Sequence, residues 1–193
     1  MDKEGIPMYV LAICGSRNPQ GQTARAVDAV LEGVVKAGGQ VERVFLPELH
    51  IERCRQFDER GWGTCRTEGH CCIEDDMDAL IAKIRAADAL LFATPVYYGD
   101  LSESMRAFTD RLRRCATHMP DTTGIAGKPT IGVCVAGGGG GGAPNCSVSL
   151  VNVLSRCGFD VVDVVPVRRQ NLEFKVNVLR LTGEWLATGS RSA

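Results

Sequence analysis

Five strand-like runs, each followed by a segment with helical spacing, are the feature that most constrains what this chain can fold into. The runs span residues 8–14, 40–48, 89–96, 129–137 and 159–167. Apolar residues recur at helical spacing over residues 23–37, 77–84, 101–115, 147–156 and 172–186. Apolar strands that alternate with helices indicate a parallel sheet covered by helices on both faces. No linker, repeat or composition shift divides the chain, so we predict one doubly wound α/β domain over residues 1–193.

The composition is that of an ordinary globular protein, and it argues against several classes of partner. A net charge of −1 over 193 residues gives no overall field that would draw the chain to nucleic acid or to an anionic membrane. We interpret the cluster of Arg111, Arg113 and Arg114 as a solvated helix face. No apolar run has membrane-spanning length, and the N-terminal stretch reads as the start of a strand rather than a signal peptide. We therefore expect no nucleic-acid or membrane partner.

The loop after the first run, residues 15–27, passes from a buried strand directly into a helix. Free backbone N–H groups and the positive end of the helix dipole meet there, which favours an anion. Ser16, Gln22 and Thr23 add side-chain donors. Five residues separate Gly15 from Gly21 and Gln22 replaces lysine, so this is not a Walker loop, and it suits one terminal phosphate better than a triphosphate. An ordinary strand–helix turn without a ligand is the alternative.

Two further loops follow the third and fourth runs. Residues 93–111 contain a proline, two tyrosines that offer π surface, and Gly99, which lets a flat ligand approach the backbone. Residues 137–142 are six consecutive glycines, an entropic cost that a planar ring lying against bare backbone would justify. Half-buried tyrosines and a flexible linker are the alternatives. Because ligands bind beyond the carboxyl ends of parallel strands, the three loops together predict a site for FMN, which has one phosphate and one flat ring.

These stretches resemble the flavodoxin-like NAD(P)H-dependent FMN reductases, and within them the branch that includes iron–sulfur flavoproteins. GSRNPQGQT is similar to that branch's GSPRKxGNT, TPVYYGDLSESMRAFTDR to SPVYFGxxSAxxKxFxDR, and CIEDDM to CxIxDDM. The resemblance implies a flavodoxin-like five-stranded parallel sheet of order 2-1-3-4-5. It also implies a set of FMN-binding positions. At two of them this chain has Asn18 and Gln22 where the family usually has Arg and Asn, but both side chains can still donate hydrogen bonds. These positions are Ser16, Asn18, Gly21, Gln22 and Thr23 for the phosphate, and Pro95, Val96, Tyr97, Tyr98, Gly99, Gly137, Gly138 and Gly139 for the ring.

A cysteine-rich insertion at about residues 50–74 holds Cys54, Cys65, Cys71 and Cys72. The resemblance implies that iron–sulfur members carry C-x2-C-x2-C and a fourth cysteine before the DDM helix, but Phe57 stands at the second position here. A [4Fe–4S] cluster generally needs four thiolates, so we expect a metal-free loop that covers the flavin or forms a subunit contact, with Trp62 as apolar cover. A cluster completed by Cys72 or by a non-thiol ligand, and a zinc site that uses His70, remain alternatives.

The other cysteines fall in strand-like or helical stretches, and we expect them to be small core residues: Cys14, Cys115, Cys134, Cys146 and Cys157. Nine cysteines are an odd number, which argues against a full disulfide framework and favours reduced thiols in the cytoplasm. Asp75 and Asp76 are the expected cap and first-turn charge of the helix that follows the insertion.

The expected function is that of an NAD(P)H-dependent FMN oxidoreductase acting on a quinone, a free flavin or a similar small acceptor. The cofactor carries such chemistry, and His50, His70 and His118 lie outside the three loops, so no catalytic residue is nominated. The resemblance implies a homodimer or a homotetramer. A flavodoxin-like or iron–sulfur flavoprotein electron carrier and a thiol or metal sensor are the alternatives, although flavodoxins are usually far more acidic than this chain.

Overall fold

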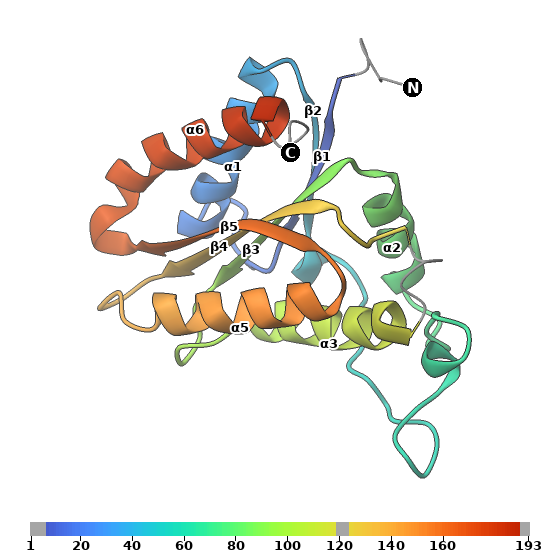
Figure 1. Ribbon diagram of the computed structural model, residues 1–193. Helices are drawn as coiled ribbons and strands as arrows, with labels where there is room; N and C mark the ends of the chain where they lie inside the picture. Colours follow the sequence, from blue (N-terminus) through green and yellow to red (C-terminus); the bar gives the residue numbers. More distant parts are fainter. Residues whose placement is uncertain (1–6, 119–123, 190–193) are drawn as a thin grey trace.

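The computed structural model describes residues 7–118 and 124–189, and within them five strands form one parallel sheet (Figure 1). Residues 1–6 and 190–193, the two ends of the predicted domain, lie outside the described residues, as do residues 119–123. The strand order is β2-β1-β3-β4-β5, which confirms the predicted topology. The strands are β1 Tyr9–Cys14, β2 Gln40–Phe45, β3 Ala89–Pro95, β4 Pro129–Ala136 and β5 Asp160–Arg168.

Helices cover both faces of the sheet, with α1 and α6 on one side and α2, α3 and α5 on the other (Figure 1). Successive residues of a strand point to opposite faces, so Val10 and Ala12 pack toward α1 and α6, whereas Leu11 and Ile13 pack toward the other three helices. The helices are α1 Gln22–Lys36, α2 Met77–Ala86, α3 Glu103–His118, α5 Ala143–Arg156 and α6 Leu172–Gly189, and short 3₁₀ turns span Leu46–Glu48, Thr64–Arg66 and Arg169–Asn171. None of the described helices is both long and apolar enough to cross a membrane.

Helices α1 and α6 cross at an unusually close point, where each contributes a glycine. A Cβ atom at Gly33 would lie 2.0 Å from the carbonyl oxygen of Arg180, and one at Gly183 would lie 2.0 Å from that of Val30. Both distances are far below van der Waals contact, so only glycine permits this approach of the two backbones. The crossing fixes α1, whose N-terminus lies at the carboxyl edge of the sheet.

Two predicted boundaries differ from the structure for local reasons. The second strand ends at Phe45, because Pro47 lies in a 3₁₀ turn over Leu46–Glu48. Helix α5 begins at Ala143 rather than at residue 147, because Gly142 adopts a left-handed N-cap (φ 82°) and a proline occupies the first turn. The second change brings the start of α5 directly against the end of the glycine run.

Candidate functional site

An open cleft of about 500 Å³ lies at the carboxyl edge of the sheet, where the loops after β1, β3 and β4 meet. It brings together every site residue predicted from the sequence except Tyr98, Gly99 and Gly139. It adds Val135 and Ala136, which sequence reasoning missed, and Gly141, which belongs to the predicted glycine run but was not named as a binding position. Val135 and Ala136 end a strand that leads into the glycine run, and that position was the available signal. The lining residues are Ser16, Asn18, Gly21, Gln22, Thr23, Pro95, Val96, Tyr97, Val135, Ala136, Gly137, Gly138 and Gly141.

The first loop presents the N-terminus of α1 to this cleft. The N–H of Arg25 is bonded back to the carbonyl of Gly21 at 3.0 Å, and the N–H groups at the preceding helical positions have no intrahelical acceptor. No acidic side chain lies in the first turn of the helix. The side-chain oxygen of Gln22 is buried without a hydrogen-bond partner, and half a turn of the amide would place its NH₂ group there instead. These groups fit an anionic ligand such as a terminal phosphate.

The first loop is held in place by the start of α3. The hydroxyls of Ser102 and Ser104 donate to the carbonyl oxygen of Gly15 at 3.0 and 3.1 Å. A Cβ atom at Gly15 would lie 2.6 Å from the Ser102 Oγ, so the absence of a side chain permits this contact. The N-terminal end of α3 therefore lies beneath the phosphate-binding candidate.

The second loop turns sharply between Tyr97 and Asp100. The two residues exchange backbone hydrogen bonds of 2.9 and 3.0 Å, and the residues between them, Tyr98 and Gly99, have positive φ values of 52° and 79°. Positive φ at both central positions is the arrangement of a type I′ turn. Tyr97 borders the cleft, whereas the Tyr98 side chain is fully exposed and does not line it.

The third loop is a fixed wall of bare backbone. Arg168 and Gln170, two further residues that sequence reasoning missed, donate to its carbonyls: Arg168 Nε to Gly140 at 2.9 Å and Gln170 Nε2 to Gly138 at 3.3 Å. A Cβ atom at Gly137 would meet no atom within 4 Å, because its position faces open space. The wall fits a flat ring that lies directly on the backbone.

The second and third loops touch each other through glycine. A Cβ atom at Gly142 would lie 2.6 Å from the Cα of Gly99, so the two backbones are in direct contact. Because the first loop is bonded to α3 and the other two loops contact each other, the three loops form one continuous rim. This is the convergence that an FMN-sized ligand requires.

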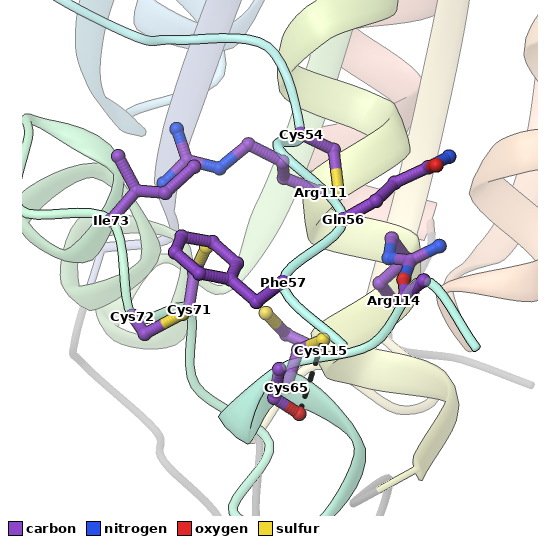
Figure 2. A pocket seen from close by; sticks show the side chains of 12 residues that line it. Cys54, Gln56, Phe57, Cys65, Cys71, Cys72, Ile73, Arg111, Arg114 and Cys115 are labelled. Atoms are coloured by element: carbon purple, nitrogen blue, oxygen red, sulfur yellow. Dashed lines mark hydrogen bonds between the residues drawn. The ribbon is translucent and has the colours of Figure 1, made fainter. Parts of the chain in front are cut away.

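The cysteine-rich insertion forms a second, separate pocket at the other end of α3 (Figure 2). No residue of 50–74 lines the cleft, so the expectation that this loop covers the flavin is wrong for this chain's own cleft. Cys115, which we expected to be a plain core residue, joins the four loop cysteines around the pocket. The pocket is lined by Cys54, Gln56, Phe57, Gly61, Gly63, Cys65, Cys71, Cys72, Ile73, Arg111, Arg114 and Cys115.

The arginines beside this pocket do not form the solvated helix face that the sequence predicted. Only 1% of the Arg111 side chain is exposed, and it forms an ion pair with Asp75. Burial lowers the pKa of Arg111, but hydrogen bonds with Asp75 and with the Cys71 sulfur outweigh burial and leave the pKa above its ordinary value. Arg114 lies 4.2 Å from the ring centre of Trp62 and donates to the carbonyl of Gly61. Trp62 therefore covers an arginine rather than a flavin.

The thiols of the pocket do not converge on one point. Among the described residues, no group of three or more His, Cys, Asp or Glu side chains is placed to hold a single metal ion. A zinc ion needs all its sulfur ligands at about 2.3 Å from one centre. His70 does not line the pocket, and its ring nitrogen lies 3.4 Å from Thr64 Oγ1. The zinc alternative that used His70 therefore has no support in this geometry.

The comparisons with known proteins agree with the geometry of the cleft. The family model described as NADPH-dependent FMN reductase matches residues 8–171. An iron–sulfur flavoprotein of Archaeoglobus fulgidus is 34% identical over 105 residues, which is 54% of this chain and 46% of that protein. One of Methanosarcina thermophila is 31% identical over 122 residues, 62% of this chain and 61% of that protein. The chain thus spans between 46% and 61% of the length of these two relatives.

A solved structure shows the same fold at lower identity. The NAD(P)H:quinone oxidoreductase from Methanothermobacter marburgensis superposes with a TM-score of 0.71 at 22% identity, over 94% of this chain and 96% of that one. At this identity the likeness concerns the arrangement of the sheet and helices alone.

Proposed function

We propose that this chain, which belongs to the NADPH-dependent FMN reductase family, binds FMN in the cleft and transfers hydride from NAD(P)H to a small acceptor such as a quinone or a free flavin. The observation that carries the proposal is the convergence of three chemically different loops on one cleft. A helix N-terminus, an aromatic–proline turn and a glycine wall match the phosphate, one edge and one face of a flavin mononucleotide.

The phosphate end of the proposal depends on α1. The N–H groups of its first turn, with the side chains of Ser16 and Thr23, supply neutral donors to a group that carries up to two negative charges. The side-chain oxygen of Gln22 is buried without a hydrogen-bond partner, and rotating the amide by half a turn would place its NH₂ donor at this point. Because the loop has no lysine and no acidic residue in the first turn, a monophosphate suits it better than a triphosphate bound with magnesium.

The ring end depends on backbone rather than on side chains. Gly137, Gly138 and Gly141 border the cleft without side chains, and Pro95, Val96 and Tyr97 border it from the turn after β3. When bound, FMN supplies the hydride chemistry at its N5 atom, so the protein needs no general base of its own. The chain orients the ring and excludes water from one of its faces.

A second candidate function is that of an electron carrier. The relatives described above are named iron–sulfur flavoproteins, and five cysteines of this chain line one pocket. These two observations support a role in electron transfer. Turnover separates the two candidates, because a carrier oxidises NAD(P)H slowly even when a quinone is present in excess, whereas a reductase does so rapidly.

Two properties of the surroundings extend the proposal. All nine cysteines are free thiols, which supports a location in a reducing cytoplasm.

Helix α6 exposes 65% of Phe174, 64% of Leu181 and 44% of Trp185, and such apolar exposure supports a homodimer or a homotetramer. The molar mass in solution, measured by light scattering at several concentrations, tests the oligomeric part of the proposal.

The function is tested on the purified full-length chain. FMN released by heat is quantified, FMN affinity is measured by quenching of flavin fluorescence, and NADH and NADPH oxidation is followed with a soluble quinone and with riboflavin. The proposal expects near-stoichiometric FMN and acceptor-dependent oxidation of at least one nicotinamide. A colourless chain that takes up no added FMN would contradict it.

A further inference from the structure

Two buried donors beside the cysteine pocket have no acceptor among the described residues. The Nε atoms of Arg111 and Arg114 are buried and make no hydrogen bond, although other nitrogens of both guanidinium groups do. Both residues line the pocket, and the Arg111 side chain is only 1% exposed, so bulk water does not reach its donor. A buried donor without an acceptor is unfavourable, and two of them at one pocket indicate a position that suits an oxygen atom.

The free space in the pocket is large enough for one such atom and little more. Its volume is about 10 Å³, which holds one water-sized group. Five cysteines, Phe57 and Ile73 form much of the wall around it. Guanidinium groups form their strongest hydrogen bonds with anionic or polar oxygen. The pocket therefore suits a small species that brings one oxygen atom to the thiols.

One thiol of the pocket combines access to solvent with a nearby guanidinium group. Cys71 is half-buried, so a small reagent reaches it, whereas Cys65 and Cys115 are buried. The Cys71 sulfur interacts with Arg111, which is itself held in place by its ion pair with Asp75. Cysteines that react with oxidants typically lie within reach of solvent and beside a positive charge. Cys71 meets both conditions.

A second thiol, Cys115 of α3, lies beside Cys71 in the same small pocket, and Figure 2 shows both side chains at its wall. Burial raises the pKa of the Cys115 thiol to about 12, and the neighbouring Cys71 raises it further, followed by Cys65. Cys115 therefore stays protonated and does not compete with Cys71 for an oxidant. It is placed to react with Cys71 once Cys71 has been oxidised.

We propose that the cysteine pocket is a site of oxidation by hydrogen peroxide, at which Cys71 is oxidised first and Cys115 then forms a disulfide bond with it. In the first step the O–O bond breaks and one oxygen is transferred to the Cys71 sulfur, which gives a sulfenic acid and one water. In the second step the Cys115 sulfur attacks Cys71, the S–O bond breaks, and the hydroxyl leaves as water with the Cys115 proton. Two thiols are thereby oxidised by two electrons in total, and one peroxide is reduced to two waters.

The structure of the pocket accounts for both steps. The Nε–H groups of Arg111 and Arg114 donate to the oxygen atom that Cys71 gains, so the free space and both unpaired donors are used. The two sulfurs must then approach to about 2.05 Å. Residues 67–76 contain no helix or strand, so the segment that carries Cys71 can shift toward α3. The disulfide joins the insertion to the helix whose start supports the phosphate loop.

The test is treatment of the purified, fully reduced full-length chain with a small excess of hydrogen peroxide. Sulfenic acid is trapped with dimedone, disulfides are mapped by mass spectrometry without reduction, and FMN is quantified separately. We expect dimedone on Cys71 at early times, a disulfide between Cys71 and Cys115 later, and recovery of both thiols with dithiothreitol. Dimedone on the exposed Cys72 alone, or a disulfide that excludes Cys115, overturns the proposal and leaves the proposed function intact.

The role of Cys115 is tested with a matched pair of variants. Cys115→Ser should abolish the disulfide and raise the fraction of Cys71 trapped by dimedone at least threefold, because the sulfenic acid then persists. Cys157→Ser should change neither quantity, because Cys157 is equally buried but does not line the pocket. Loss of the Cys71 sulfenic acid in Cys115→Ser as fast as in the wild type overturns the assignment of Cys115.

The role of the guanidinium donors is tested on α3. Arg114→Met removes one unpaired donor and keeps a long apolar stem, and it should slow oxidation of Cys71 at least fivefold. Arg113→Met is the control, because Arg113 is the neighbouring residue on the same helix but does not line the pocket, and its rate should stay within twofold of the wild type. Equal rates in the two variants overturn the role of the donors.

A measurement on the unaltered chain covers the case in which a variant does not fold, as judged by loss of cooperative melting. Oxidation of Cys71 and of the exposed Cys72 is compared for hydrogen peroxide and for tert-butyl hydroperoxide, whose bulky group does not enter so small a pocket. The ratio of the Cys71 rate to the Cys72 rate should fall at least tenfold with the larger peroxide. An unchanged ratio overturns the proposal that the pocket receives the oxidant.

Discussion

Arg111 and Asp75 form a two-bond ion pair in the interior, with Nη1 to Oδ2 at 2.5 Å and Nη2 to Oδ1 at 3.0 Å. The side chains are 1% and 0% exposed. Arg111 also donates to the carbonyl of Glu52 at 3.1 Å, and Asp75 accepts the N–H of Glu52 at 2.8 Å. Residues 52 and 75 bracket the four cysteines of the insertion, so a single ion pair fixes both ends of that loop against α3.

Replacing Asp75 with Asn should lower the free energy of unfolding by about 3–5 kcal/mol, because it leaves the Arg111 charge buried without a counter-ion. The measurement is denaturant unfolding at pH 7. Glu103→Gln, which removes the exposed Arg17–Glu103 pair, is the control and should change stability by less than about 1 kcal/mol. Equal effects of the two substitutions would show that the buried pair contributes no more than a surface pair.

The same pair predicts how stability depends on pH. Burial raises the pKa of Asp75, but the hydrogen bonds from Arg111 and from the N–H groups of Glu52 and Met77 outweigh burial and hold the pKa below its ordinary value. The contribution of Asp75 to stability is therefore complete above the unfolded-state pKa of about 3.9 and is lost as the pH falls through the lower, folded-state value. Wild-type stability should decline below about pH 4, and Asp75→Asn should decline less steeply over that window. Parallel curves would contradict this assignment.

Gly137→Val should weaken FMN binding at least tenfold while leaving the fold intact. The added side chain enters open space in the cleft, because a Cβ atom at Gly137 meets nothing within 4 Å and its φ is not in the left-handed region. Gly139→Val is the matched control: a Cβ atom there also meets open space, but Gly139 does not line the cleft. Fluorescence titration with FMN measures both. Equal affinities of the two variants would mean that the glycine wall does not contact the ring.

The fold and the rim of the cleft were predictable because their signals are local in sequence. Strand and helix periodicity set the element order, and the loops that follow buried strands must meet at one edge of a parallel sheet. The cysteine pocket was not predictable in the same way. Arg111 pairs with Asp75, which lies 36 residues away in the chain. The residues next to Arg111 in the sequence do not indicate whether its guanidinium group is buried or exposed to solvent.

Cys115 escaped prediction for a related reason. Its place on the inner side of α3 made it look like a core residue, and it is buried. What sets it apart from Cys157 is the insertion that packs over its part of the helix, and the register of that packing depends on tertiary contacts such as the Arg111–Asp75 pair. Arg168 and Gln170 were missed for the same reason. Their side chains bond to the carbonyls of Gly140 and Gly138, which lie 28 and 32 residues earlier in the chain, and these contacts depend on the tertiary fold.

Gly183→Ala should destabilise the protein by about 1–3 kcal/mol, the usual cost of overpacking a close contact. The new methyl group would lie 2.0 Å from the carbonyl oxygen of Val30, so α1 and α6 must separate. Leu181→Ala, on the exposed side of the same helix, should change stability by no more than about 0.5 kcal/mol. Thermal unfolding of both variants measures this. Because the crossing positions α1, FMN affinity should fall in Gly183→Ala and not in Leu181→Ala.

Tyr98→Asn should stabilise the protein by about 1 kcal/mol, because Tyr98 holds a positive φ of 52° that a bulky residue adopts only at a cost. Asn-Gly is the sequence that a type I′ turn prefers, and the substitution removes a side chain that is fully exposed and makes no contact with the cleft. Denaturant unfolding measures the gain, and FMN affinity should stay within about twofold of the wild type.

The rate of NAD(P)H oxidation by Tyr98→Asn distinguishes two roles for Tyr98: forming the turn alone, or contacting a substrate or a second subunit. If Tyr98 serves only the turn, NAD(P)H oxidation by Tyr98→Asn stays at the wild-type rate. If the exposed ring contacts the nicotinamide, the acceptor or a second subunit, turnover falls although FMN remains bound, and Tyr98→Phe restores it because the ring is kept. We expect the second outcome, since strain that persists beside a binding cleft needs a compensating function. Unchanged turnover together with higher stability would contradict it.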